Sequence, residues 1–209
     1  MPFRIEKYET GFQGIGATVA LALKQLGEPL PTNPSLSVLN PIPVYASRGS
    51  ILGSAVGKLV RRTGWRSIVM SNATPVALVD LPQKATESPR PTSIRGHDAA
   101  AALLRVLHEA DRVPGLAKTA YVLRFIVFPS LFVTALWLSS RKPLFIPTRI
   151  GSHGRPLPTV YTESNFLALL ERRHAGKLRS SRKVTTRAKA NPTKRPTAKP
   201  RPRTKPQRR

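Results

Sequence analysis

Cysteine, acidic side chains and long apolar runs are scarce in this chain of 209 residues. The absence of cysteine excludes a disulfide framework and a thiolate nucleophile, and it argues against a structural zinc site. The 10 acidic residues are few for chemistry that needs paired carboxylates. The uncharged stretch with the densest aromatic and β-branched content falls short of the roughly 20 residues that a membrane-spanning helix requires.

That stretch, Phe125 to Ser140, decides the expected fold class. Pro129 would interrupt a helix, and Phe, Val, Ile and Thr favour strands over helices. The joints at residues 129–130 and 139–142 have the composition of turns. We therefore expect a buried antiparallel meander, and not a transmembrane helix, with strands at Ala120–Phe128, Leu131–Leu138 and Pro143–Thr148.

The rest of the chain alternates short strand patterns with amphipathic helical patterns. Strands are predicted at Phe3–Tyr8, Trp65–Met70 and Pro75–Leu81, and a proline-rich extended connector at Glu28–Pro43. Helices are predicted at Ala17–Leu26, Ser50–Arg62 and Asp98–Arg112, and a last one from Thr162 or Ser164 to a stop at Gly176. The expected fold is α+β, with an antiparallel sheet of about five strands and three or four helices packed on it. The expected division is an N-terminal region at 1–43, a core domain at 44–174 and a basic tail at 175–209.

Two glycine motifs raise the question of a nucleotide cofactor. Residues 10–16 are similar to the TGxxxGIG loop of short-chain dehydrogenases with one residue missing, which would imply a dinucleotide site. The preceding strand is charged, however, and no tyrosine is followed four residues later by lysine as in that family. Residues 53–58 resemble a P-loop that is one residue short, with Leu59 in place of the Ser or Thr that binds the metal. We expect neither site, and no cofactor.

Histidines and acids near one helix suggest a metal or acid–base site, but their spacing does not support it. His97 lies about three turns from His108 and Asp111, and no third ligand follows at a metal-binding interval. An enzyme is left open only in the form of a site assembled from distant residues such as His97, His153 and Arg155.

Positive charge is the strongest functional signal, since 35 lysines and arginines give a formal net charge of +25. Fourteen of them lie in residues 175–209, and no acidic residue follows Glu171. The tail has no aromatic residue and resembles the Lys/Pro/Ala-rich tails of linker histones and of some bacterial nucleoid-associated proteins. Its composition predicts a disordered segment. Its cations are Lys177, Arg179, Arg182, Lys183, Arg187, Lys189, Lys194, Arg195, Lys199, Arg201, Arg203, Lys205, Arg208 and Arg209.

This charge predicts non-specific, electrostatic binding of DNA or RNA, because phosphate neutralisation needs neither a motif nor a pocket. The best additional contacts in the core domain are Lys58, Arg61, Arg62 and Arg66. The alternative is peripheral attachment to an anionic membrane surface, with Phe125–Leu138 partly inserted. The N-terminus lacks the apolar run of a signal peptide, so an intracellular location, cytoplasmic or nucleoid-associated, is expected.

Overall fold

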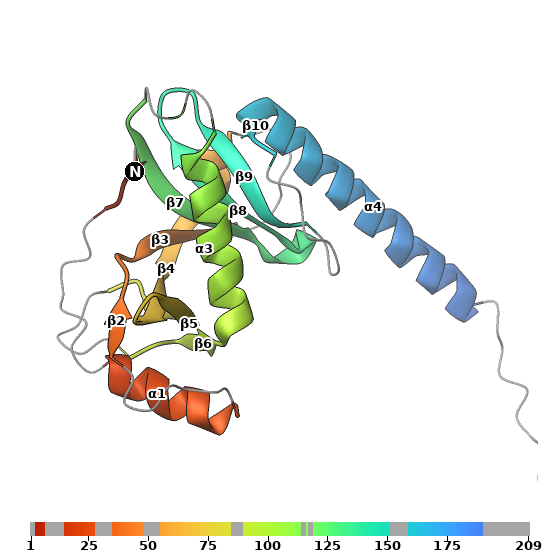
Figure 1. Ribbon diagram of the computed structural model, residues 1–209. Coiled ribbons are helices and arrows are strands. Elements are labelled where there is room, and N and C mark those ends of the chain that lie inside the picture. Colours follow the sequence, from red (N-terminus) through yellow and green to blue (C-terminus); the bar gives the residue numbers. More distant parts are fainter. Residues whose placement is uncertain are drawn as a thin grey trace, which may run out of the picture. The chain divides into compact units, whose positions relative to one another are not determined.

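The computed structural model describes residues 3–6, 15–27, 35–47, 55–84, 90–113, 116, 119–150 and 159–189, with side chains up to Lys177. The chain divides into two compact units, Met1–His174 and Ala175–Arg209. The first unit combines a mixed sheet with helices (Figure 1). The α+β class is confirmed, but the expected size and direction of the sheet are wrong: it has ten strands and contains parallel as well as antiparallel pairs.

Eight strands form one continuous path in the order β10-β9-β8-β7-β3-β4-β5-β6. Two further strands, β1 and β2, pair with β7 and β4 respectively. The bounds of the strands are β1 Phe3–Arg4, β2 Leu36–Val38, β3 Ile42–Ser47, β4 Val60–Ser71, β5 Thr74–Pro82, β6 Ser93–Arg95, β7 Tyr121–Phe128, β8 Val133–Ser139, β9 Leu144–Ile150 and β10 Tyr161–Thr162.

Both hairpin regions predicted from the sequence are present. The meander consists of β7, β8 and β9, with a short 3-10 helix at Pro129–Leu131 between the first two. The hairpin of β4 and β5 turns at Asn72, whose φ of 54° suits an asparagine in a tight turn. The two antiparallel groups meet where β3 pairs in parallel with β7, which the sequence analysis did not anticipate.

The helices are α1 (Ile15–Gln25), the short α2 (Val56–Leu59), α3 (His97–Asp111) and α4 (Glu163–Lys189). The helix predicted over Ser50–Arg62 is wrong in its last part, because β4 begins at Val60; residues 50–54 lie outside the described chain. The stop predicted at Gly176 is also wrong, since α4 continues to Lys189. Residues 177–189 of the tail have helical backbone in the structure, whereas residues 190–209 lie outside the described chain.

Alternating side chains of the strands build cores on both faces of the sheet. On one face α3 packs its Ala100 and Leu103 against a cluster that includes Leu123 of β7. On the other face α1 covers β4 and β5, while α2 and the first turns of α4 cover β7, β8 and β9. Figure 1 shows α3 in front of the sheet.

Candidate nucleic-acid interface

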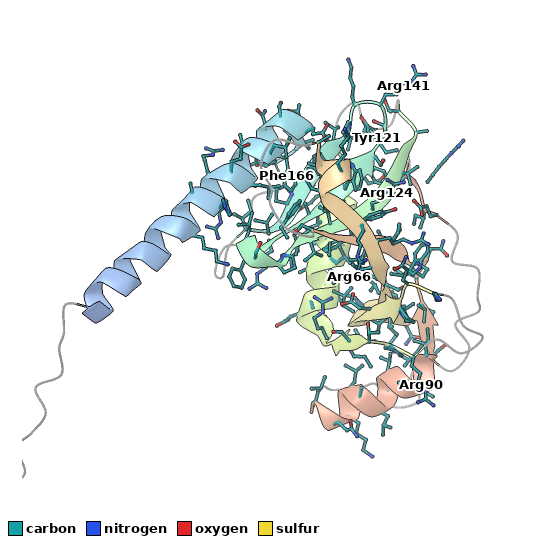
Figure 2. All side chains as sticks on the ribbon, turned by 180° about the vertical axis from the view of Figure 1, so that it is seen from behind. Arg66, Arg90, Tyr121, Arg124, Arg141 and Phe166 are labelled. Atoms are coloured by element: carbon teal, nitrogen blue, oxygen red, sulfur yellow. The ribbon has the colours of Figure 1, made fainter. Side chains whose placement is uncertain are left out.

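A row of aromatic and arginine side chains crosses the sheet on the face opposite α3. Phe145, Trp137 and Arg124 stand directly opposite one another on β9, β8 and β7. The rings of Phe145 and Trp137 stack at 6.1 Å, and the Arg124 guanidinium carbon lies 4.9 Å from the Trp137 ring centroid. Figure 2 views this side of the sheet and labels Arg124, with Phe166 of α4 on the same side. Phe166 extends the row, because it stacks on Phe145 at 4.5 Å.

The row continues across the parallel strand pair to a carboxylate shared by two arginines. Arg124 also lies 5.2 Å from the Tyr45 ring centroid. Its Nη2 donates to Oε1 of Glu6 at 3.1 Å, and Nη1 of Arg62 donates to Oε2 of the same carboxylate at 3.4 Å. Arg62 in turn lies 4.9 Å from the Trp65 ring centroid. Glu6, Arg62 and Arg124 are called the Glu6 cluster below.

The Glu6 cluster is accessible and carries a net positive charge. One carboxylate faces two guanidinium groups, and the side chains of Arg62, Glu6 and Arg124 are 36%, 28% and 25% exposed. The rings beneath them are buried, with Trp65 at 4% and Trp137 at 7% exposure. The surface therefore presents guanidinium groups fixed over aromatic faces, an arrangement suited to an anionic oxygen and not to base stacking.

Lys58 lies on α2, a short helix whose first residue, Val56, is held by two interactions. The Val56 side chain is buried, and its backbone N–H donates to Oε1 of Glu163, the first residue of α4, at 2.8 Å. Lys58 and Arg61 are exposed, as expected for contact residues. Of the four cations predicted for the core domain, these two and Arg62 are at the surface.

The prediction for Arg66 is wrong, because this side chain is buried with 7% exposure. The cause is a bulge in β4: Tyr45 pairs with Arg62 but Val44 pairs with Gly64, so Thr63 is an extra residue. Arg62 and Arg66, four positions apart, would share a face of a regular strand. The bulge places Arg62 on the Tyr45 side and Arg66 under α3.

Arg66 belongs to a second cluster in which one carboxylate again serves two arginines. Its Nε and Nη2 donate to the two oxygens of Asp80 at 2.6 and 3.1 Å, and Nη2 of Arg95 donates to Asp80 at 3.0 Å. The Arg66 guanidinium lies 4.3 Å from the Phe125 ring centroid. Burial, and next the charge of Arg66, lowers the pKa of Arg95 from its usual value. Asp80, Arg66 and Arg95 are called the Asp80 cluster below.

The cations of the C-terminal segment lie only partly within the described chain. Lys177 is exposed, and Arg179, Arg182, Lys183, Arg187 and Lys189 belong to the helical backbone of α4. The other eight lie outside the described residues. From Arg172 to Lys189 the helix contains eight lysines and arginines and no acidic residue.

Of the three residues named for an enzymatic site, His97 lies in the described chain. His97 is exposed, and its Nδ1 lies 2.7 Å from the carbonyl oxygen of Pro75. His153 and Arg155 lie outside the described residues. Among the residues that are described, no group of three or more His, Cys, Asp or Glu side chains could hold a metal ion.

The segment Phe125–Leu138, proposed as a membrane contact, is sheet and mostly buried core. Pro129, Ser130 and Phe132 are exposed in the turn between β7 and β8, and Phe132 is the large apolar side chain among them, at 55% exposure. In the part of the chain covered by the structure, no helix is long and apolar enough to cross a membrane.

Sequence reasoning missed Glu6, Tyr45, Arg124, Asp80 and Arg95. A carboxylate or arginine inside a strand pattern gives a signal only once the cross-strand register is known, and the register depends on the parallel β3–β7 pair. Comparison with protein families, with curated proteins and with solved structures finds no match to this chain.

Proposed function

We propose that this protein binds nucleic acid through phosphate contacts, with little preference for base sequence. The observation that carries the proposal is the charge of residues 172–209, which contain sixteen lysines and arginines and no acidic residue. Duplex DNA presents one negative charge per about 1.7 Å of its length, and neutralising these charges releases condensed counterions. The segment contains no Phe, Tyr or Trp, so it lacks the aromatic platforms on which successive bases stack.

The helical part of this segment matches the spacing of phosphates. Residues 175–189 span about 22 Å at a rise of 1.5 Å per residue, a length over which a duplex carries about thirteen phosphates. Arg179, Lys183 and Arg187 follow one another at intervals of four, and such like-charged pairs each destabilise a helix by about 0.2–0.5 kcal/mol. Bound phosphates would remove this repulsion, so binding should increase the helix content.

The Glu6 cluster would provide a second contact on the core domain. Two arginines share one carboxylate there, and the excess charge is held in place by the rings of Tyr45 and Trp137. Arginine binds phosphate in a planar, two-pronged geometry, and preorganisation lowers the entropy cost of forming it. Lys58 and Arg61 add exposed charge nearby in the sequence.

A salt titration of binding to two unrelated duplexes of equal length tests the proposal. The logarithm of affinity should fall linearly with the logarithm of salt, with a slope of about −5 to −10 that is the same for both duplexes. A chain ending at Gly176 should have a much shallower slope. The matched control keeps the full length but replaces the fourteen cations of residues 175–209 with glutamine, which separates charge from chain length.

Three results would contradict nucleic-acid binding of this kind. They are binding that is insensitive to salt, a strong preference for one duplex, and full affinity in the glutamine chain. Anionic lipid vesicles serve as a competitor in the same titration. If the vesicles displace the duplex at equal charge concentration, the segment binds polyanions in general and has no preference for nucleic acid.

A further inference from the structure

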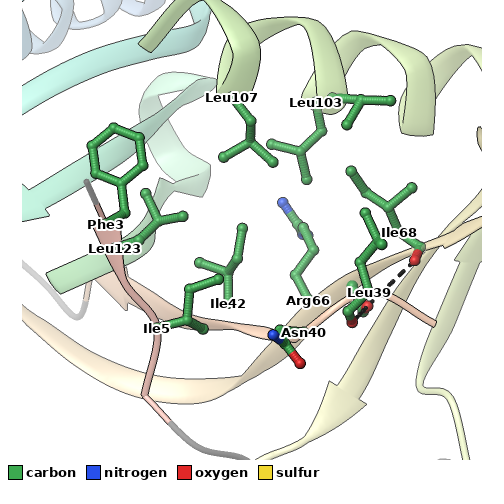
Figure 3. A pocket seen from close by; sticks show the side chains of 12 residues that line it. Phe3, Ile5, Leu39, Asn40, Ile42, Arg66, Ile68, Leu103, Leu107 and Leu123 are labelled. Atoms are coloured by element: carbon green, nitrogen blue, oxygen red, sulfur yellow. Dashed lines mark hydrogen bonds between the residues drawn. The ribbon is translucent and has the colours of Figure 1, made fainter. Parts of the chain in front are cut away.

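An apolar cavity lies between α3 and the strands beneath it, on the face of the sheet away from the Glu6 cluster. It has a volume of about 200 Å³ and twelve lining residues. Nine of these are apolar, contributed by β1, β3, β4, β7 and α3 and by the residues that flank β1 and β2. Figure 3 shows Leu103 and Leu107 of α3 facing Ile42 across the space, with Arg66 between them. An alkyl chain bound here would bury apolar surface, which is favourable in proportion to the area removed from water.

The one charged residue that lines the cavity is Arg66. Its Nε and Nη2 are occupied by Asp80, but Nη1 makes no hydrogen bond to any residue that the structure describes. The guanidinium is fixed by this fork and by the ring of Phe125. Arg66 therefore offers the cavity a rigid cationic donor.

Asp80 does not cancel this charge, because it also pairs with Arg95. Two arginines and one carboxylate leave the Asp80 cluster with one net positive charge, close to an apolar space. Nε of Arg95 is buried without a hydrogen-bond acceptor among the described residues, so the cluster lacks acceptors as well as negative charge. A carboxylate at Nη1 of Arg66 would supply the missing negative charge.

We propose that this cavity binds a short or medium-chain fatty acid, with the alkyl chain among the leucines and the carboxylate on Nη1 of Arg66. An engineered cavity of about 150 Å³ holds benzene, so 200 Å³ accommodates about eight non-hydrogen atoms in proportion. Hexanoate has this size. The site is separate from the proposed nucleic-acid contacts, and its test does not depend on them.

Calorimetric titration with a series of ligands separates the cavity from the cationic surface. Affinity should rise by roughly fourfold per methylene as the chain lengthens from butanoate and level off between hexanoate and octanoate, because the cavity is then full. Hexanol should bind at least about tenfold more weakly than hexanoate, and hexylammonium no better than hexanol. The titration is run at 0.5 M salt, which screens binding of anions to exposed charges.

Two matched leucine substitutions locate the site. Leu107→Trp places an indole in the cavity from a half-buried position of α3 and should abolish hexanoate binding. Leu21→Trp adds the same ring at a position of α1 that is 61% exposed, and should leave binding unchanged. Arg66→Met should reduce the affinity for hexanoate to that for hexanol. If Arg66→Met does not fold, Leu107→Trp and the ligand series still test whether hexanoate binds in the cavity.

Several outcomes would overturn the proposal. Hexanoate and hexanol of equal affinity would show that Arg66 does not recognise the carboxylate. Affinity that keeps rising to dodecanoate, or binding that survives Leu107→Trp, would place the ligand on the surface. The absence of saturable binding by any carboxylate of four to eight carbons would show that the cavity is only a packing defect.

Discussion

The Asp80 cluster makes a sharp prediction about stability, because its three members are buried to different degrees. The side chain of Arg66 is 9% exposed, that of Asp80 23% and that of Arg95 41%. Removing one partner of a buried ion pair leaves an uncompensated charge and costs about 3–5 kcal/mol. Asp80→Asn should therefore lower the free energy of unfolding by about 3 kcal/mol, the low end, since Asp80 is partly exposed.

Substitutions of the two arginines of the cluster should lower the free energy of unfolding less. Arg66→Met leaves Asp80 paired with Arg95, so the carboxylate keeps a partner on its more exposed side. Arg95→Met should cost about 0–1 kcal/mol, as for exposed ion pairs, because it also removes an Nε–H that has no acceptor among the described residues. The double variant Arg66→Met/Asp80→Asn should be more stable than Asp80→Asn alone, since it no longer buries an unpaired guanidinium.

Urea denaturation followed by tryptophan fluorescence measures these differences. Trp65 and Trp137 are both buried, so the signal reports on the core of the first unit. For a chain of this size a loss of 3 kcal/mol corresponds to about 6–12 °C in melting temperature. The reasoning is refuted if Asp80→Asn costs no more than Arg95→Met, or if the double variant is less stable than Asp80→Asn.

Three other predictions test the geometry of the sheet and of the Glu6 cluster. Gly64→Ala should cost about 1–3 kcal/mol or more, because an added Cβ would lie 2.4 Å from the carbonyl oxygen of Leu81. Gly57→Ala should be neutral or stabilising, because the nearest atom to its added Cβ lies at 3.8 Å. Equal melting temperatures for the two variants would show that β5 does not approach Gly64 this closely. Trp137→Ala should lower the free energy of unfolding by about 3–5 kcal/mol. Trp137→Phe should lower it much less, because the indole Nε1 has no acceptor among the described residues and the substitution removes this unsatisfied donor. Equal losses of stability in thermal melts would contradict this. Glu6→Gln should lower the free energy of unfolding by at most about 1 kcal/mol. It should also steepen the salt dependence of duplex binding, measured by fluorescence anisotropy. An unchanged slope would exclude the Glu6 cluster from the interface.

The part of the fold that could be predicted from the sequence is the part in which local pattern and tertiary packing agree. The meander and the β4–β5 hairpin are runs of β-branched and aromatic residues closed by turn residues, and their antiparallel pairing follows from short connections. The helix α3 follows from its leucine spacing and from Asp98 in its first turn. Each of these elements could be identified without knowing its neighbours.

The centre of the sheet could not be predicted, because β3 carries a proline and follows a proline-rich stretch. Pro43 cannot donate to a neighbouring strand, which makes a central position improbable from sequence alone. In the structure β3 pairs with β4 from Ile42 onward, but its pairing with β7 begins only at Val44. Pro43 thus has a neighbouring strand in register on one side only. The proline is tolerated because no strand of the described residues pairs with it on the other side.

The helix α4 was predicted too short for a related reason. Cations in a final turn and a glycine after them are stop signals when proline or turn residues follow. After Gly176 no proline occurs until Pro192, so the cost of the glycine, about 1 kcal/mol, is the only local opposition to continuing the helix. The assignment of Arg66 to the same surface as Arg62 was wrong for another reason, because the sequence does not mark the bulge that separates the two side chains.

The bulge at Thr63 determines how the charge of β4 is used. If β4 were regular through Thr63, Arg62 and Arg66 would lie on one face, and a single patch would have to accommodate both. With it, Arg62 joins Glu6 and Arg124 at the accessible surface, while Arg66 joins Asp80 and Arg95 beneath α3. In both places a carboxylate is shared by two arginines, so neither cluster is neutral. The exposed cluster can meet a phosphate of a large polyanion, whereas the carboxylate proposed for the cavity would meet Nη1 of Arg66 beneath α3. The two proposed activities should therefore be separable by substitutions on opposite faces of one strand.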